Sequence, residues 1–197
     1  MDTLTSILKL VTKGSRMVFV DLKQAYYSCP IAKSQQKLLK FNWKGQLYKF
    51  VCFPNGLACC PRKFTKLLKP VFSSLRKMGY VTAGYIDDTF LQGESYTECF
   101  QNVVDSVDLF QKLGFVIHPD KSVFKPTQTL TFLGFIIDSV NMTVKLTAEK
   151  AEKIKQFCIK ILNSKKLRLD NLLNIGNMTA SFPGVMYGPL YYRQIET

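Results

Sequence analysis

Short apolar runs alternate along this chain with longer segments in which apolar residues recur at helical spacing. The short runs are bounded by Gly, Pro, Asn or Asp, which is typical of β-strands. The longer segments begin at capping residues or end at Gly, which is typical of α-helices. The pattern predicts an α+β fold, with a mainly antiparallel sheet of short strands and helices on one face. The predicted helices are 4–12, 61–78, 96–113, 147–162 and 170–182, and the predicted strands are 17–20, 37–43, 46–53, 82–86, 89–92, 115–117, 122–124, 131–138 and 142–146.

Two of these predicted elements carry carboxylates at informative positions. Asp87 and Asp88 form the tip of the hairpin between strands 82–86 and 89–92, and Asp21 directly follows strand 17–20. Asp tolerates the backbone angles of tight turns, so the dipeptide alone favours an ordinary turn. An unpaired charge at the end of a buried strand is costly, however, and packing the hairpin beside that strand would bring three carboxylates together. Carboxylate oxygens are the ligands that Mg²⁺ prefers, and two such ions serve nucleotide polymerisation.

The distribution of charge narrows the class of function. The 197 residues include 27 Lys and Arg against 14 Asp and Glu, which gives a net charge of +13. Residues 1–86 hold 15 bases and two acids, residues 87–120 hold seven acids and one Lys, and residues 121–168 hold ten bases and three acids. Two basic regions flanking an acidic one suit a polyanion held on both sides of a site that gathers metal cations. A soluble protein with a basic surface is the alternative that charge leaves open.

Composition excludes several other classes. With 47% hydrophobic residues the chain can bury a core, so a disordered protein is excluded. No apolar run reaches the roughly 18 residues of a membrane span, and basic residues interrupt the N-terminal apolar segment. The six Cys lack CxxC spacing and are accompanied by one His, which favours reduced thiols over a zinc site or disulfides. We therefore expect an intracellular protein, cytoplasmic or nuclear, with no membrane partner.

Five motifs follow one another in the order found in reverse transcriptases. Residues 19–26 resemble the first palm motif of that family, and residues 53–57 with Pro61 and Phe64 resemble the next. Residues 84–88 resemble the catalytic hairpin, and residues 114–121 and 132–135 look like the two palm motifs that follow it. Residues 181–185 and 187–193 look most like elements of the DIRS-like, tyrosine-recombinase type, with the gypsy-like LTR group as second choice.

The resemblance implies a division into domains. A polymerase palm would span residues 1–146, with a partial fingers hairpin at about residues 28–53, and a thumb-like helical region would span residues 147–197. Only 20 residues precede Asp21, so we expect much of the fingers to be missing. The chain is then expected to be part of a longer polyprotein, or a shortened genomic remnant. RNase H and recombinase or integrase segments of that polyprotein are the expected protein partners.

The resemblance also implies catalytic roles. Asp21 and Asp87 would ligate two Mg²⁺ or Mn²⁺ ions, and Asp88 would be a weaker, more distant ligand. Lys121 would protonate or neutralise the leaving pyrophosphate, although a solvated loop lysine fits the same position. The Tyr26 ring would lie under the sugar and exclude a 2′-hydroxyl, with core packing as the alternative.

Further positions would bind substrate or nucleic acid. Leu22, Asn55 and Gly56 would contact the incoming nucleotide or the template, although retroviral enzymes commonly carry Gln at the Asn55 position. Trp43 would either contact the template or cap a small fingers core. The implied nucleic-acid-binding residues are Tyr85, then Phe132, Leu133 and Gly134 of a primer-grip hairpin, and Lys150 and Lys153, which would face either duplex phosphate or water.

The function implied is that of an RNA-directed DNA polymerase of a retroelement. Such an enzyme transfers a nucleotide from a dNTP to a primer 3′-hydroxyl on an RNA or DNA template. Two alternatives stay open. One is a catalytically inactive nucleic-acid-binding remnant of such an enzyme, and the other is a palm-fold enzyme of another class, such as an RNA-dependent RNA polymerase.

Overall fold

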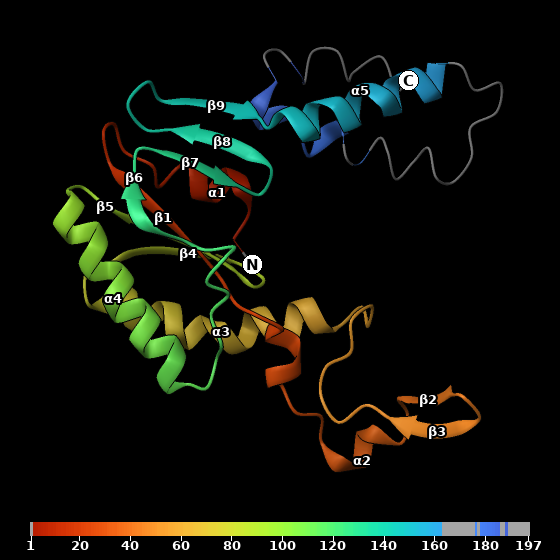
Figure 1. Ribbon diagram of the computed structural model, residues 1–197. Coiled ribbons are helices and arrows are strands. Elements are labelled where there is room, and N and C mark those ends of the chain that lie inside the picture. The colour runs from red at the N-terminus through yellow and green to blue at the C-terminus, as the bar shows by residue number, and fades with distance from the viewer. Residues whose placement is uncertain (1, 163–175, 177, 186–187, 189–197) are drawn as a thin grey trace. The chain divides into compact units, whose positions relative to one another are not determined.

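The structure is a computed structural model that describes residues 2–162, 176, 178–185 and 188 (Figure 1). The chain packs as two compact units, Met1–Val11 with Ser15–Thr127 and Thr12–Gly14 with Gln128–Thr197. The boundary expected between residues 146 and 147, between palm and thumb, stays a prediction.

The first unit is built around a four-stranded antiparallel sheet. Its strands stand in the order β4, β5, β1, β6, so that β1 lies between the β4–β5 hairpin and the edge strand β6. The predicted apolar runs supply the inner strands, and the mainly antiparallel sheet expected from the sequence is confirmed. The bounds are β1 Arg16–Asp21, β4 Val81–Tyr85, β5 Asp88–Gly93 and β6 Val123–Thr127.

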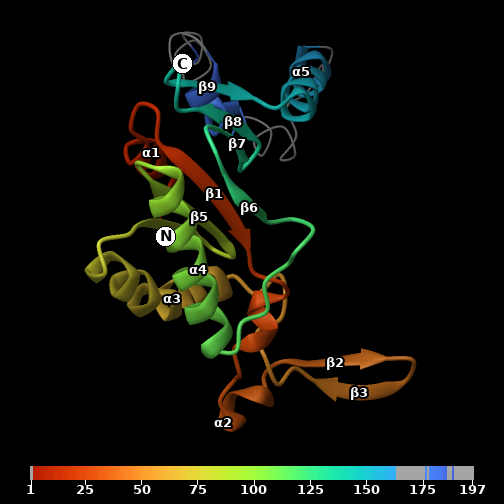
Figure 2. The same ribbon diagram turned by 60° about the vertical axis from the view of Figure 1, so that its left-hand side comes forward.

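Two amphipathic helices, α3 (Cys60–Lys77) and α4 (Tyr96–Lys112), cover one face of this sheet. The Phe72 ring of α3 lies against Gly84, and Cys99 of α4 packs with Leu91. Gly84 pairs with the residue two positions before Leu91, so both contacts lie on the same face. The two helices also meet each other, since Phe72 and Phe110 lie edge to face with ring centroids 6.2 Å apart. Figure 2 shows both helices on this side of the sheet.

The ends of these helices follow the sequence closely. Pro61 lies in the first turn of α3, as the pattern indicates. At the start of α4 the Ser95 side chain accepts from the Glu98 N–H and the Glu98 carboxylate accepts from the Ser95 N–H. The predicted capping box is therefore confirmed.

The other elements of the first unit are short. Strands β2 and β3 form a separate two-stranded antiparallel sheet, and every residue of both strands is exposed. Figures 1 and 2 both show this hairpin standing away from the four-stranded sheet. The bounds are α1 Leu4–Leu8, the 3-10 helix η1 Ala25–Ser28, α2 Lys33–Gln36, β2 Lys40–Trp43 and β3 Gln46–Lys49.

The second unit contains a three-stranded antiparallel sheet in the order β7, β8, β9. Alternate residues of β7 and β8 are buried, which matches the period of a half-buried strand. The bounds are β7 Thr129–Phe132, β8 Phe135–Asp138, β9 Thr143–Leu146, α5 Ala148–Leu162 and the 3-10 helix η2 Phe182–Gly184.

Several sequence-based predictions of secondary structure are wrong. The strand expected over 131–138 is two strands, because Leu133 and Gly134 take φ of +50° and +77° and reverse the chain. Residues 115–117 form no strand, and Ile117 makes a single isolated bridge to Leu22. The first helix ends at Leu8 instead of residue 12. Residues 170–175 and 177 of the last expected helix lie outside the described residues.

The structure also contains elements that the pattern did not indicate. The 3-10 helix η1 and the short α2 occupy a stretch for which the pattern predicts no helix or strand, and the β2–β3 hairpin is shorter than the predicted strands 37–43 and 46–53. Strand β6 runs to Thr127 and includes Pro126, which an edge strand tolerates. Within the described ranges, no helix is long and apolar enough to cross a membrane.

Candidate active site

The three carboxylates singled out in the sequence lie where β1 ends and β5 begins. Asp21 is the last residue of β1 and the cross-strand partner of Asp88, the first residue of β5. Asp87 immediately precedes Asp88 in the turn of the β4–β5 hairpin. All three residues are half-buried. The structure therefore brings the predicted carboxylates to one end of the two central strands.

The turn of the β4–β5 hairpin lies one residue earlier than predicted. Tyr85 pairs with Asp88, so the turn consists of Ile86 and Asp87 and not of the two aspartates. Ile86 takes φ of +58°, a left-handed conformation that is rare for a β-branched residue. The Leu22 N–H donates to the Asp87 carbonyl at 3.1 Å and ties the turn to the residue that follows β1. Packing, and not a turn-forming residue, imposes this conformation.

Asp21 is also held from its other side by the loop that precedes β6. The Asp21 N–H donates to Ser122 Oγ at 3.0 Å, and the Ser122 hydroxyl donates to the His118 carbonyl at 2.7 Å. The His118 N–H donates to the Asp21 carbonyl at 2.9 Å. Ser122 could not be found from the sequence, because a serine between Lys121 and a short apolar run carries no signal of its own. Its contacts fix the backbone that presents the Asp21 carboxylate.

The three carboxylates repel one another in a partly desolvated environment. The pKa of Asp88 is raised to about 7, chiefly by burial and in addition by the charges of Asp87 and Asp21, while the charge of Lys121 lowers it. Burial also raises the pKa of Asp87. A hydrogen bond from its own backbone lowers that pKa, Asp21 raises it, and Lys121 lowers it. One lysine therefore faces a group of acids that additional positive charge would stabilise.

The donor set suits a hard divalent cation. All three side chains offer only carboxylate oxygens, which Mg²⁺ and Mn²⁺ favour. Mg²⁺ usually takes one or two carboxylates and completes its shell with water and substrate phosphates. Among the residues that the structure describes, no group of three or more His, Cys, Asp or Glu side chains is placed so that it could hold a metal ion.

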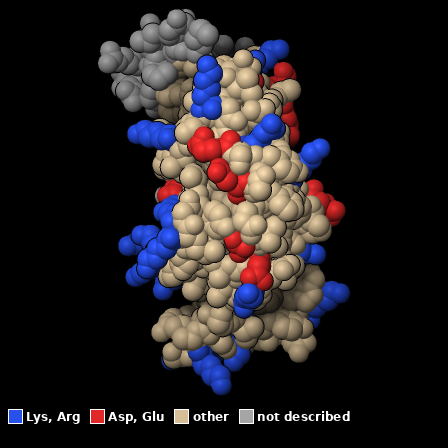
Figure 3. All heavy atoms as spheres, turned by 90° about the vertical axis from the view of Figure 1, so that its left-hand side faces the viewer, with Lys and Arg blue, Asp and Glu red and all other residues tan. Residues whose placement is uncertain are grey.

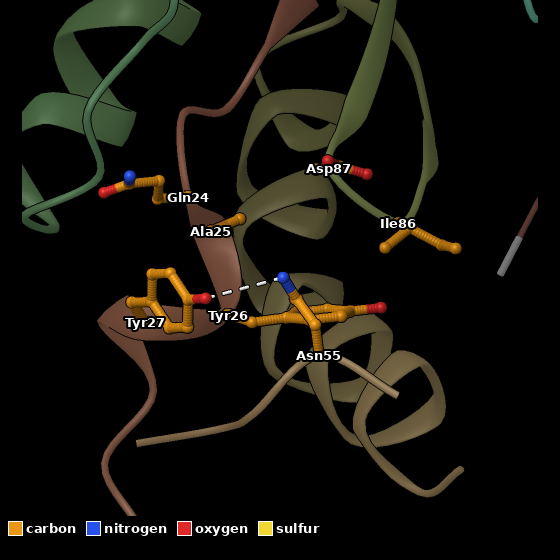
Figure 4. Close-up of a pocket in the computed structure, with 7 residues that line it drawn as sticks. All are labelled: Gln24, Ala25, Tyr26, Tyr27, Asn55, Ile86 and Asp87. Carbon is orange, nitrogen blue, oxygen red and sulfur yellow. Dashed lines mark hydrogen bonds between the residues drawn. The ribbon is translucent and has the colours of Figure 1, made fainter. Parts of the chain in front are cut away.

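A pocket of about 250 Å³ adjoins Asp87. Figure 4 shows the Tyr26 ring and Asn55 on the side of the pocket opposite Asp87. The Tyr26 ring packs edge to face on Phe64 of α3, with ring centroids 5.5 Å apart, so it has a fixed orientation. The Asn55 side-chain amide donates to the Tyr27 hydroxyl at 3.5 Å. The lining residues are Gln24, Ala25, Tyr26, Tyr27, Asn55, Ile86 and Asp87.

The other predicted substrate-binding residues of the first unit are placed differently. The Leu22 side chain is buried in the core between the sheet and α3, so its backbone and not its side chain adjoins the carboxylates. Gly56 is exposed with φ of +87° in the loop before α3. Tyr85 is half-buried at the end of β4. Lys121 is exposed, close enough to lower the pKa of both Asp87 and Asp88.

The predicted primer-grip and thumb residues belong to the second unit. Phe132 is buried, and Leu133 and Gly134 form the turn between β7 and β8. The Lys150 ammonium donates to the Leu133 carbonyl at 3.2 Å and lies 3.8 Å from the centroid of the Phe135 ring in β8. Burial lowers the pKa of Lys150. Lys153 pairs with Glu149 at 2.6 Å one turn away on α5.

Known structures share this fold. A foamy viral protease–reverse transcriptase in complex with double-stranded DNA superposes with a TM-score of 0.69 and 22% sequence identity, over 91% of this chain and 30% of that one. The fold is therefore that of a reverse transcriptase, with antiparallel sheets and associated helices.

Comparisons of sequence identify the family. The family model described as reverse transcriptase (RNA-dependent DNA polymerase) matches residues 1–137, and the chain belongs to that family. The Pro-Pol polyprotein of simian foamy virus type 1 is 24% identical over 177 residues, 89% of this chain. The transposon Tf2-3 polyprotein of Schizosaccharomyces pombe is 24% identical over 138 residues, 70% of this chain. The chain spans only 14% and 10% of the length of these two relatives.

Proposed function

We propose that this chain catalyses RNA-directed DNA synthesis at the end of β1 and β5. The observation that carries the proposal is the meeting of Asp21, Asp87 and Asp88 beside a pocket walled by a fixed aromatic ring. In the reaction the primer 3′-hydroxyl oxygen bonds to the α-phosphorus of a dNTP, and the bond to the departing pyrophosphate breaks. The charges of Asp21 and Asp87 raise the pKa of the half-buried Asp88, so grouping these carboxylates at one sheet end is unfavourable unless a cation binds there.

Asp21 and Asp87 would hold the two divalent ions, Mg²⁺ or Mn²⁺, with Asp88 as the weaker ligand. The ions would lower the pKa of the primer hydroxyl and offset the charge of the triphosphate. The chain itself fixes the geometry, because the backbone of Asp21 is held by Ser122 and His118 and that of Asp87 by Leu22. Lys121 stands on the same side as the carboxylates and would neutralise or protonate the pyrophosphate.

The pocket would receive the nucleotide. The Tyr26 ring would lie under the sugar, where its packing on Phe64 keeps it from moving aside for a 2′-hydroxyl. Asn55 would contact the base or sugar from the loop before α3, with Gly56 allowing close approach of the backbone. Leu22 would contribute through its backbone. Tyr85, the Phe132–Phe135 hairpin with Leu133 and Gly134, and Lys150 and Lys153 would contact primer or template.

The wider setting is also a proposal. The relatives are viral and transposon polyproteins, which supports a retroelement origin and a parent polyprotein carrying RNase H and integrase or recombinase segments. The DIRS-like type is favoured over the gypsy-like type by residues 181–185 and 187–193. The template would be RNA or DNA with a primer, and the site of action would be the cytoplasm or nucleus.

Primer extension with Asp87→Asn tests the proposal. On an RNA template with dNTPs and Mg²⁺ or Mn²⁺, we expect the variant to lose extension by about 10³-fold, because several kcal/mol of charge stabilisation is removed. Asp108→Asn is the matched control, since Asp108 is exposed on α4 and forms an ion pair with Lys112 one turn away. Equal extension by Asp87→Asn and the parent chain would contradict the proposal. So would a parent chain that binds primer–template with steep salt dependence but never extends it, which is the behaviour of an inactive remnant.

Replacement of Tyr26 tests the sugar selection. Tyr26→Ala should admit ribonucleotides about tenfold to a hundredfold more readily relative to dNTPs, because a steric contact worth a few kcal/mol is lost. Tyr26→Phe keeps the ring and should keep the selectivity. Unchanged selectivity in a folded Tyr26→Ala variant would show that the ring serves core packing.

A further inference from the structure

A second cavity of the first unit has a volume of about 590 Å³ and is lined by residues between Pro30 and Lys63. None of its lining residues has a role in the proposed function. Small-molecule sites in proteins are mostly apolar cavities of about 300–1,000 Å³ that hold a few convergent polar groups. The volume of this cavity is therefore that of a small-ligand site.

The walls of the cavity are mainly apolar. Ile31 and Leu39 come from the segments on either side of α2, and Phe53 and Leu57 come from the loop before α3. All four side chains are half-buried, so each still has apolar surface in contact with water. A ligand with an apolar body would remove this surface from water, which is favourable.

A cation stands among these apolar walls. Lys63 and Cys59 both line the cavity, and they lie one turn apart at the start of α3, where the Lys63 N–H donates to the Cys59 carbonyl at 3.0 Å. Among the described residues, Lys63 forms no ion pair with a carboxylate. An anionic group of a ligand would give the Lys63 ammonium a charged partner.

The stretch of chain around the cavity carries only positive charge. No Asp or Glu occurs from residue 22 to residue 86, and every lining residue belongs to this stretch. Figure 3 shows acidic side chains over the middle of the molecule, whereas its lower end, where Figure 1 places α2 and the β2–β3 hairpin, shows only Lys and Arg. An anion that enters the cavity therefore meets a positive environment.

The cavity is separate from the nucleotide pocket, although one loop contributes to both. Asn55 lines the nucleotide pocket, whereas Phe53 and Leu57, two residues to either side, line this cavity. The Phe53 N–H donates to the Cys29 carbonyl at 3.0 Å, and the Cys60 N–H donates to the Leu57 carbonyl at 2.9 Å. Both ends of the loop are thus held in place, and the two cavities share no lining residue.

A hollow on the surface of α3 shows that volume alone does not select such a ligand. It also measures about 590 Å³, but its lining residues are Lys69, Ser73, Arg76 and Lys77. These side chains would attract any anion and offer no apolar wall to the body of a ligand. Lys69 is therefore a matched control for Lys63, since both are exposed lysines of the same helix.

We propose that the cavity formed by α2, the loop before α3 and the start of α3 binds a small organic anion with an apolar body, such as an aromatic or long-chain sulfonate or carboxylate. The body would contact the apolar walls, and the anionic group would pair with the Lys63 ammonium. The inference goes beyond the proposed function, because it requires neither the carboxylates at the end of β1 and β5 nor a nucleotide.

Binding to the full chain can be measured with anilinonaphthalene sulfonate, an aromatic sulfonate whose fluorescence rises in apolar surroundings. Phenylnaphthylamine, which has the same rings without the sulfonate, is the uncharged comparison. Lys63→Gln should weaken binding of the sulfonate about tenfold, given the worth of a hydrogen bond between charged groups, and should leave binding of the uncharged probe unchanged.

Two control variants accompany this measurement. Lys69→Gln removes a charge of the same helix from the other hollow and should bind both probes like the parent chain. Asp87→Asn should also bind both probes like the parent chain. A failed polymerase assay and a failed binding assay therefore remain distinguishable.

Cys59 reports where the probe binds, because its exposed thiol lines the cavity. With the sulfonate at about ten times its Kd, alkylation of Cys59 by iodoacetamide should slow about tenfold, since only the free chain reacts. The half-buried Cys158 of the second unit should react at the same rate with and without the probe. Mass spectrometry of the alkylated peptides measures both rates.

Four outcomes would overturn the inference. The first is no rise in fluorescence with the parent chain. The second is a rise in fluorescence with no protection of Cys59, which places binding elsewhere. The third is equal weakening of sulfonate binding by Lys63→Gln and Lys69→Gln. The fourth is protection of Cys59 in the concentrated chain without probe and without competition by the sulfonate, which makes a second copy of the chain the occupant.

Discussion

The first unit contains two hairpins of the same topology in opposite surroundings. The β4–β5 hairpin is part of a four-stranded sheet, is covered by α3 and α4, and carries carboxylates at its turn. The β2–β3 hairpin pairs with no other described strand, is exposed along both strands, and carries lysines. Charge is therefore informative in different ways. In the packed hairpin the half-buried acids reduce the free energy of unfolding and therefore indicate a cation site. In the exposed hairpin the lysines reduce it little, and by themselves they indicate no binding site.

The turns of the two hairpins also differ in what stabilises their backbone conformation. Lys44 and Gly45 both take positive φ, as a tight two-residue hairpin turn requires, and Gly45 does so without steric cost. Ile86 takes a positive φ with no glycine beside it and depends on the surrounding contacts. Local sequence forms the exposed turn, and tertiary packing forms the catalytic one.

Removal of one buried and one exposed phenylalanine would test this difference most strongly. Phe90 of β5 is completely buried, so Phe90→Ala should lower the free energy of unfolding by about 3–5 kcal/mol. Phe41→Ala in β2 should cost only about 1 kcal/mol, the worth of its contacts with other rings. Urea unfolding followed by circular dichroism measures both. Similar losses in the two variants would mean that the β2–β3 hairpin is as integral to the core as β5.

Replacing one glycine in each hairpin gives a smaller contrast. A Cβ at Gly84 would overlap the Phe72 ring, so Gly84→Ala should destabilise the fold by about 2–3 kcal/mol through overpacking. A Cβ at Gly45 would meet nothing, and Gly45→Ala should cost about 1 kcal/mol for its left-handed backbone alone. The same unfolding assay compares them, and a larger loss at Gly45 would refute the difference in packing.

The smallest expected effect is a dependence on pH at the carboxylates. The pKa of Asp88 is raised to about 7 in the folded chain, above its usual value of 3.8, so ionisation of Asp88 opposes folding. This destabilisation is absent below about pH 4, grows as the pH rises, and is complete above about pH 7. In the presence of a chelator, Asp88→Asn should gain about 1 kcal/mol relative to the parent between pH 4 and pH 8, after allowance for solvent screening. A difference that does not change with pH would show that neither burial nor the charges of Asp87 and Asp21 raise the pKa of Asp88.

Much of the fold could be predicted because its signals are local. Pro61 and Gly79 indicate the two ends of α3, the helical spacing of apolar residues predicts α4, and Ser95 with Glu98 marks the start of α4. The carboxylates were found because Asp21 and the Asp87–Asp88 pair interrupt apolar runs within recognisable motifs.

The parts that could not be predicted depend on contacts distant in sequence. The turn at Ile86 is held by a hydrogen bond to Leu22, and Asp21 is held by Ser122, 101 residues away. Lys150 lies against the β7–β8 turn because its ammonium contacts the Leu133 carbonyl and the Phe135 ring. The spacing of lysines on a helix does not reveal such contacts.

The second unit is discontinuous in sequence, because Thr12–Gly14 pack with it while the residues on either side belong to the first unit. The Gly14 N–H donates to the Ser139 carbonyl at 2.9 Å, and the Gln128 side-chain amide donates to the Gly14 carbonyl at 2.9 Å. A protease that cuts after Thr127 would therefore nick the chain without removing these bonds. A chimera that takes its second unit from a related protein should therefore take residues 12–14 from that protein as well as the segment that begins at Gln128. If only the segment from Gln128 onward were exchanged, residues 12–14 of one protein would have to pack against the second unit of another.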